Sequence, residues 1–354
     1  MPVSHKAKQS GAQKRKRAKV KRIVFRTLLY IFTVLLLVVF GVYAMLNVAF
    51  NGPSTTAADV LTESLLESSA LKFVPYIFYT DERVEQIKQR NSVVTTYDEV
   101  DTSLITFTQA ENAKSQTEEG PDIYIEDDIR VEEIKGATYQ GWMMIVKDPS
   151  RVFVGVSTDY FTDNQPGLLI GELADKYNAV GAVNGGAFSD SNGQGNGGMA
   201  EGLTISEGKI MNTYVAEDFT TVGFDENNVL VIGNFSRAQA EEKHIRDAVS
   251  FGPALIINGE PAKTSGASSG LNPRTAIGQC ADGSVLLLVI DGRQVNSLGA
   301  SYADLIEIML RYGAVNACNL DGGTSSNMVY EGEMLNTGAP IIGARHIPTA
   351  VLVR

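Results

Sequence analysis

Three short polar motifs, each directly after an apolar run, hold the residues of this chain that could do chemistry. They are NGGAF from Asn184, DGR from Asp291 and DGGTSS from Asp321. Taken singly, Asn-Gly and Asp-Gly pairs are common turn formers. Brought together, their carboxylates, hydroxyls and glycine amides would suit hydrolysis of a glycosidic or phosphate-ester bond. The fold must decide between these two interpretations.

The composition argues against several other chemistries. The chain has only three histidines, His5, His244 and His346, which disfavours a zinc site built from His and Cys. A Ser-His-Asp triad would need His244 or His346 as its base, and no GxSxG motif is present. A nucleotide-binding GxxxxGK[ST] loop is also missing. The two cysteines, Cys280 and Cys318, allow one disulfide or two buried thiols, and both options stay open.

The apolar runs around the motifs predict how they are positioned. The run VLLLVI before Asp291 and the run AVNACNL before Asp321 flank a predicted helix over 301–312. Strand, helix, strand is the pattern of a βαβ unit with parallel neighbouring strands. Because parallel strands end at the same edge of a sheet, we expect Asp291 and Asp321 to emerge together. Asn184 follows NAVGAV and a second predicted helix over 168–178, and we expect it to join them.

Other runs complete the predicted fold class. WMMIVKD, RVFVGVS, VLVIGNF, ALIINGE and RTAIGQC are typical of strands, and most are bounded by Gly, Asp or Pro. We therefore predict an α+β domain: a mixed sheet that contains a parallel βαβ unit, with helices packed on it, preceded by a transmembrane helix.

Charge is divided sharply along the chain. Residues 1–26 hold ten of the 30 Lys and Arg and no acid, so 20 bases face 41 acids in the remainder. Residues 27–50 follow without a charge and are long enough to cross a bilayer as a helix. The basic flank predicts a cytoplasmic N-terminus and a single-pass cell-membrane protein with its C-terminal domain extracytoplasmic. A cleaved signal peptide, with Val42-Tyr43-Ala44 before the cut, is the alternative.

The predicted organisation has four parts. These are a basic cytoplasmic tail (1–26), a transmembrane helix (27–50), a helical stalk and polar linker (51–121) and a compact domain (122–354). The membrane is then a partner through residues 27–50. The acidic exterior would repel polyanions, so no nucleic-acid partner is expected.

A series of motifs in fixed order makes the compact domain similar to a known family. The motifs are NGGAF (184–188), SFGPALIINGE (250–260), NPRTAIGQ (272–279), LLLVIDGRQ (286–294), NLDGGTSS (319–326) and RHIPTAVLV (345–353). Together they resemble the phosphodiester glycosidase family over 122–354. Ala187 departs from the pattern, since relatives often carry an aromatic residue there.

The resemblance implies hydrolysis of a sugar joined through its anomeric carbon to a phosphodiester. It implies catalytic roles for Asp321, Asp291 and Arg274. It further implies a substrate-binding set of Asn184, Gly185, Gly186, Gly322, Gly323, Thr324, Ser325, Ser326, Arg345 and His346. Either aspartate would serve as base or nucleophile, and a carboxylate separation of about 5 Å or of about 6.5–9.5 Å would distinguish the two routes.

Several further expectations stay open at this stage. Asp190 and Glu201 are possible second acids, although solvated loop residues are the favoured interpretation, and the loop over 189–198 would suit a lid. No cofactor is expected, and a Ca²⁺ ion is left unassigned. The expected partner is a phosphosugar or glycan substrate, in surface glycan, wall polymer or exopolysaccharide. The alternatives are a sugar or phosphosugar transferase in exopolysaccharide assembly and a non-catalytic glycan-binding protein.

Overall fold

A computed structural model describes most of the chain as two compact units, Met1–Ala58 and Asp59–Arg354. The described residues are 5–68, 70–95, 99–107, 123–126, 128–190, 195–212, 220–336 and 344–354. Residues 108–121 of the predicted linker and 191–194 of the predicted lid lie outside them.

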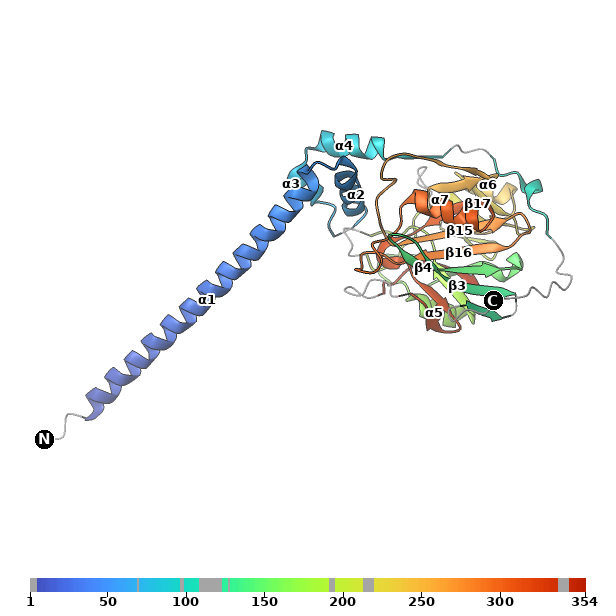
Figure 1. Cartoon of the computed structure of the whole chain (residues 1–354). Helices are drawn as coiled ribbons and strands as arrows, with labels where there is room; N and C mark the ends of the chain where they lie inside the picture. The colour runs from blue at the N-terminus through green and yellow to red at the C-terminus, as the bar shows by residue number, and fades with distance from the viewer. Residues whose placement is uncertain are drawn as a thin grey trace. The chain divides into compact units, whose positions relative to one another are not determined.

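The first unit is built on one long helix, α1 (His5–Asn51) (Figure 1). Its stretch Arg17–Asn51 is the one helix among the described residues that is long and apolar enough to cross a membrane, judged by length and composition. The predicted span over 27–50 lies within it. A signal sequence near the N-terminus has the same features, so the helix alone does not decide between the two.

Three helices lie where the sequence predicts a helical stalk. They are α2 (Thr55–Leu66), α3 (Pro75–Phe78) and α4 (Asp81–Arg90). Pro75 begins α3, where its missing N–H costs no helical hydrogen bond. The hydroxyl of Thr80 then accepts from the N–H of Arg83 and caps α4.

These helices are tied to one another and to the rest of the unit. The carboxylate of Asp59 on α2 accepts from Arg90 Nε on α4 at 2.6 Å. Ser64 Oγ on α2 accepts from the N–H of Leu271 at 2.8 Å. Asn91 Oδ1 also accepts from the N–H of Ala267. This segment therefore packs on the residues that the sequence assigns to the compact domain.

The largest sheet has eight strands in the order β13-β12-β17-β15-β16-β4-β3-β2, and the strands β17, β15, β16, β4 and β3 can be followed in this order in Figure 1. Its strands are β2 (Ile123–Glu126), β3 (Ile129–Lys135), β4 (Gln140–Val146), β12 (Ala254–Ile257), β13 (Glu260–Pro261), β15 (Arg274–Cys280), β16 (Val285–Ile290) and β17 (Ala314–Leu320). The two longest helices of the C-terminal region are α5 (Ile170–Tyr177) and α7 (Tyr302–Arg311), close to their predicted bounds. Ser301 caps α7 through a capping box with Asp304.

Two five-stranded sheets and one short pair complete the unit. The sheet in the order β19-β18-β6-β20-β5 consists of β5 (Val152–Val156), β6 (Gly181–Asn184), β18 (Met328–Tyr330), β19 (Glu333–Met334) and β20 (Thr349–Val353). The sheet in the order β10-β9-β11-β7-β8 consists of β7 (Thr204–Ser206), β8 (Lys209–Asn212), β9 (Thr220–Asp225), β10 (Leu230–Gly233) and β11 (Ile245–Phe251). The short pair is β1 (Val93–Val94) with β14 (Lys263–Thr264).

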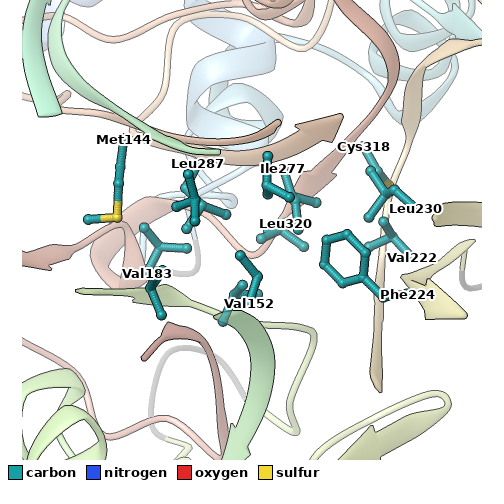
Figure 2. Packing of buried hydrophobic residues seen from close by; sticks show 14 of the residues in the cluster. Met144, Val152, Val183, Val222, Phe224, Leu230, Ile277, Leu287, Cys318 and Leu320 are labelled. Atoms are coloured by element: carbon teal, nitrogen blue, oxygen red, sulfur yellow. The ribbon is translucent and has the colours of Figure 1, made fainter. Parts of the chain in front are cut away.

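The main core lies where the three large sheets face one another. Buried apolar side chains from all three sheets meet there, as Figure 2 shows for Met144, Ile277, Leu287, Leu320, Val152, Val183, Val222, Phe224 and Leu230. A second cluster joins α7 to the large sheet, a third joins α5 to the sheet of β6 and β20, and a fourth joins α6 (Arg237–Glu242) to β11. Such burial is the dominant favourable term in folding.

The predicted parallel pairing is wrong, because every strand pair among the described residues is antiparallel. Strand β15 lies between β16 and β17 and pairs antiparallel with both. A tight turn over 281–284 makes β15 and β16 a hairpin, so β17, returning from α7, pairs with the other edge of β15. The strands β16 and β17 therefore run in the same direction, one strand apart. Asp291 and Asp321 consequently follow strands that end at one edge of the sheet, beside Arg274 at the start of β15.

Candidate active site

A cavity of about 330 Å³ opens at this edge of the large sheet. Its walls come from eight separate parts of the chain, including the segment that joins α2 to α3. The lining residues are Glu67, Ser68, Ala70, Ala187, Phe188, Asp190, Glu201, Phe251, Asn272, Pro273, Arg274, Arg293, Asp321, Gly322, Gly323, Thr324, Ser325 and Arg345.

Asp321 presents a partly unsatisfied carboxylate to the cavity. Its Oδ1 accepts from the N–H of Gly322 at 2.8 Å. Its Oδ2 is fully buried and has no hydrogen-bond partner among the described residues. Since buried polar atoms are almost always hydrogen-bonded, this oxygen keeps a free acceptor position that a proton could take.

The surroundings of Asp321 raise its pKa to about 6. Burial of the carboxylate is the largest cause, because it disfavours the charged form, and the negative charge of Asp190 acts in the same direction. The Ser325 hydroxyl, the Gly322 N–H and the charge of Arg345 act the other way. Asp321 is therefore poised to change its protonation state near neutral pH.

Arg274 is held rigidly at the wall of the cavity. It is buried, and its Nη2 donates to Ser269 O at 3.0 Å while its Nε donates to Ala300 O at 3.3 Å. Its guanidinium lies 4.1 Å from the ring centroid of Tyr302. Its Nη1 lies 3.5 Å from Glu67 Oε2. This cation is thus fixed in place before any ligand binds.

Arg345 is a second cation of the cavity and forms a two-point ion pair. Its Nη1 and Nη2 donate to the two carboxylate oxygens of Asp190 at 2.7 and 2.9 Å. The guanidinium also lies 4.8 Å from the ring centroid of Phe188. Asp190 therefore has a definite partner in the site and is more than a solvated loop residue.

Arg293 and Glu67 were not predicted from the sequence. Arg293 Nη2 donates to Asn272 Oδ1 at 3.0 Å and lies 3.5 Å from Glu67 O. Arg293 stands in the motif DGR that the sequence singles out, so that motif could have suggested it. Glu67 lies in the predicted stalk, and no local pattern indicates that it reaches the cavity.

The two glycine pairs let backbone segments approach closely. A Cβ on Gly185 would lie 2.5 Å from Thr349 Oγ1, and one on Gly186 would lie 2.7 Å from Ser250 O. Gly323 has φ of +64°, a conformation that favours glycine. Gly322 and Gly323 line the cavity, whereas Gly185 and Gly186 join β6 to its neighbours behind it.

Asn184 supports the cavity from behind without lining it. Its Nδ2 donates to Asp321 O at 2.5 Å, and its Oδ1 accepts from Thr275 Oγ1 at 2.7 Å and from the N–H of Asn327 at 3.3 Å. Asn184 thus joins the end of β6 to the ends of β15 and β17. It is buried and orients the backbone that carries Asp321.

Asp291 also stands behind the cavity wall. Its Oδ1 accepts from Asn336 Nδ2 at 2.9 Å, and its carbonyl accepts from Ser297 Oγ at 2.6 Å. Of the other predicted residues, Thr324 and Ser325 line the cavity. Ser326 is buried outside the lining, and His346 is exposed and also outside it.

The described residues contain no group of three or more His, Cys, Asp or Glu side chains that could hold a metal ion. Both cysteines are free thiols, and burial raises the pKa of Cys280 to about 11. What the cavity gathers is one carboxylate with an unsatisfied oxygen, other carboxylates at its walls, and three arginines. Guanidinium groups match phosphate oxygens, and the carboxylate can act on an adjacent carbon centre.

Comparison with known proteins yields relatives that match parts of this chain. An uncharacterised SPbeta prophage-derived protein of Bacillus subtilis, YomE, is 30% identical over 200 residues, which is 53% of this chain and 29% of that protein. The N-acetylglucosamine-1-phosphodiester alpha-N-acetylglucosaminidase of Bos taurus is 38% identical over 64 residues, which is 18% of this chain and 12% of that enzyme. The chain therefore spans less than a third of either relative.

A solved structure shares the fold. The zebrafish N-acetylglucosamine-1-phosphodiester alpha-N-acetylglucosaminidase catalytic domain, auto-inhibited by its pro-peptide, aligns with a TM-score of 0.54 and 23% identity. The alignment covers 69% of this chain and 87% of that domain. Residues 177–354, half of the chain, match the family model described as phosphodiester glycosidase. These residues include most of the cavity wall and every residue that the motifs predicted, and the protein belongs to the phosphodiester glycosidase family.

Proposed function

We propose that this protein is a membrane-anchored, extracytoplasmic hydrolase of sugar-1-phosphodiesters in surface glycan, wall polymer or exopolysaccharide. The observation that carries the proposal is the unsatisfied Oδ2 of Asp321 in a cavity lined by three arginines. Family membership supports the reaction class. The apolar stretch within α1 supports the anchor.

The reaction follows from the bond to be broken. A water oxygen forms a bond to the anomeric carbon, the bond from that carbon to the bridging oxygen breaks, and the electron pair leaves with the phosphate monoester. Asp321 takes the proton from the water, or attacks the carbon itself and is later released by water. Arg274, Arg293 and Arg345 stabilise the charge on the departing phosphate.

The leaving group explains the shape of the site. A phosphate monoester leaves more readily than a sugar alkoxide, so cationic donors can replace much of the work of a strong general acid. Arg274 suits this role because its other hydrogen bonds hold it in place. Preorganised donors are effective because they need not reorient during the reaction.

The test is release of free N-acetylglucosamine from a synthetic N-acetylglucosamine-1-phosphodiester by the full chain in detergent. Asp321→Asn should abolish release, and Arg293→Ala should reduce it, while the circular dichroism spectra of both variants match that of the folded wild type. In heavy-oxygen water the label should enter the sugar. Label in the phosphate would mean cleavage of the bond between phosphorus and oxygen and would reject the glycosidase assignment.

The same assay separates the competing functions. With a sugar acceptor present, a transferase would form a new glycoside at the expense of free sugar. A glycan-binding protein would bind the diester without turnover, and Asp321→Asn would leave its binding unchanged. Either result would reject the hydrolase.

A further inference from the structure

A cluster of large apolar side chains is exposed directly after the cavity residues of the segment that joins α2 to α3. Leu71, Phe73, Tyr76 and Ile77 are 46%, 58%, 47% and 57% exposed. We call these four residues the apolar patch. Among the described residues of the second unit, the other exposed large hydrophobics are more widely scattered along the chain, for example Tyr160, Leu310 and Met334. Gathered exposed apolar groups mark interaction sites, whereas scattered ones do not.

The charge of the patch differs from that of the chain around it. Residues 70–80 contain one lysine, Lys72, and no acid, although 20 bases face 41 acids beyond residue 26. The patch itself therefore carries no negative charge that an anionic lipid surface would repel, although Asp81 and Glu82 follow it in the sequence. Tyr and Phe are also the kind of amphipathic or apolar ring that lies at the boundary between headgroups and acyl chains.

The position of the patch in the sequence favours a membrane as its partner. Helix α1 ends at Asn51, and Leu71 follows 20 residues later. Even a fully extended chain of that length spans no more than about 70 Å, and α2 shortens it further. With the span retained, the patch cannot move far from the bilayer.

The patch is also continuous in sequence with the cavity wall. Ala70 lines the cavity and directly precedes Leu71. On a second wall, Arg293 lines the cavity and is followed by Val295 and Leu298, which are 103% and 54% exposed. Two of the segments that form the cavity therefore continue into exposed apolar residues. A membrane contact there would place the cavity at the lipid surface.

We propose that the apolar patch docks on the outer face of the bilayer, so that the cavity takes sugar phosphodiesters whose aglycone is a membrane lipid. This inference rests on the anchor and the hydrolysis proposed above. The phosphodiester then lies at headgroup level, where Arg274, Arg293 and Arg345 meet it. The side chains enter the interface by about 5–10 Å, as amphipathic surface segments do.

The test places a tryptophan in the patch of the full chain. Phe73→Trp is reconstituted in vesicles of phosphatidylcholine and phosphatidylglycerol with brominated acyl chains, and its fluorescence is compared with that in unbrominated vesicles. Trp142, the single native tryptophan, packs against the core and gives the baseline in the wild type. The matched control is Leu310→Trp, because Leu310 is 41% exposed near the end of α7, next to the edge of the sheet where β17 begins, opposite the cavity.

Docking predicts a blue shift and quenching for Phe73→Trp, with Leu310→Trp remaining at the baseline. Phe73→Trp at the baseline, or equal quenching of both variants, would overturn docking. A patch that bound a second copy of the chain would shift the emission without brominated-lipid quenching, which would also overturn it. Flotation of the chain with the vesicles tests the membrane anchor separately. A chain that floats but shows no quenching keeps its anchor and contradicts only the docking of the patch.

A second arm tests the substrate. The double variant Phe73→Ser, Ile77→Ser should hydrolyse a soluble sugar-1-phosphodiester at the wild-type rate and lose activity toward a lipid-linked one in vesicles. If the double variant kept the wild-type rate on both substrates, the proposal of a lipid-linked substrate would be wrong. Failure of the wild type on both would instead contradict the proposed hydrolysis.

Discussion

At the scale of residues, the two aspartates that the sequence treats alike have different surroundings. Asp321 faces the cavity with one unsatisfied oxygen, whereas Asp291 accepts a hydrogen bond from Asn336 behind the wall. Asp321 is therefore the better candidate for the catalytic base or nucleophile. Asp291 is better placed to hold the loop after β16.

The raised pKa of Asp321 predicts the acidic limb of the rate profile. The group must be ionised to act, and its pKa in the folded protein is about 6. We expect kcat/KM to fall as pH decreases through about 6 and to be level above it. A pH series with a soluble diester measures this. A limb near pH 3.8, the ordinary value for an aspartate, would show that burial does not control the reacting group.

Two neighbours should move this limb in opposite directions. The charge of Asp190 raises the pKa of Asp321, and that of Arg345 lowers it. Asp190→Asn should therefore shift the limb to lower pH, and Arg345→Gln should shift it to higher pH. The same pH series on both variants tests the pair. Shifts in the same direction would mean that loss of the ion pair between them dominates.

Motifs predicted part of the site because those residues follow their strands directly. Asp321, Gly322, Gly323, Thr324 and Ser325 line the cavity as one continuous stretch. Glu67 could not be found in this way, since its place depends on how α2 packs on segments about 200 residues away in the sequence. Sequence patterns describe neighbours along the chain, whereas cavity walls are set by tertiary packing.

At the scale of elements, apolar runs predicted strands well and their pairing poorly. β15, β16 and β17 all occur where continuous apolar runs indicate them, because each is buried on both faces. The strand, helix, strand pattern predicts a parallel pair, but the preceding hairpin puts β15 between the two strands. Asp291 and Asp321 still follow strands that end at the same edge of the sheet. This is because β16 and β17 are each antiparallel to β15 and therefore run in the same direction.

The junction of β6 and β20 should not tolerate a side chain at Gly185. A Cβ there would lie 2.5 Å from Thr349 Oγ1 and 2.9 Å from its carbonyl carbon. We expect Gly185→Ala to destabilise the protein by about 1–3 kcal/mol, as overpacking does. Gly171→Ala on α5 is the matched control, because no atom lies within 4 Å of its added Cβ. It should leave stability unchanged or raise it by less than the roughly 0.5–1 kcal/mol of a mid-helix position, because Gly171 is the second residue of α5. Chemical denaturation measures both, and equal effects would contradict the packing at β20.

Helix α2 should make stability depend on pH through Glu63. Burial raises the pKa of Glu63 to about 7, and its Oε1 has no hydrogen-bond partner among the described residues. A raised carboxyl pKa means that the folded state holds the proton more tightly, so stability is lost as pH rises from about 4.5 through about 7. The variant Glu63→Gln stays neutral and should avoid this loss.

Denaturation of wild type and Glu63→Gln across this range provides the measurement. The difference between the two proteins cancels the contribution of Asp321, which acts in the same direction. The free energy of unfolding of Glu63→Gln should increase relative to that of the wild type as pH rises. If the difference in unfolding free energy between the two proteins stayed constant with pH, the ionisation of Glu63 would not destabilise the folded protein.

At the scale of the whole molecule, retention of the apolar helix decides where the enzyme works. With the span retained, the mature protein should still contain residues 27–50 and should sediment with membranes after a high-salt wash. Intact-mass measurement on protein purified from cells tests this. A new N-terminus just after Ala44 would establish cleavage and reject the anchor, and the domain would then be secreted.

The cavity is built from residues as far apart as Glu67 and Arg345, near the two ends of the second unit. Because chains are synthesised from the N-terminus, the cavity cannot be complete until Arg345 has been made. A nascent or truncated chain that ends before Arg345 would carry Glu67 and Asp321 without a complete cavity wall. The site therefore forms late in synthesis, long after the residues of its first wall have been made.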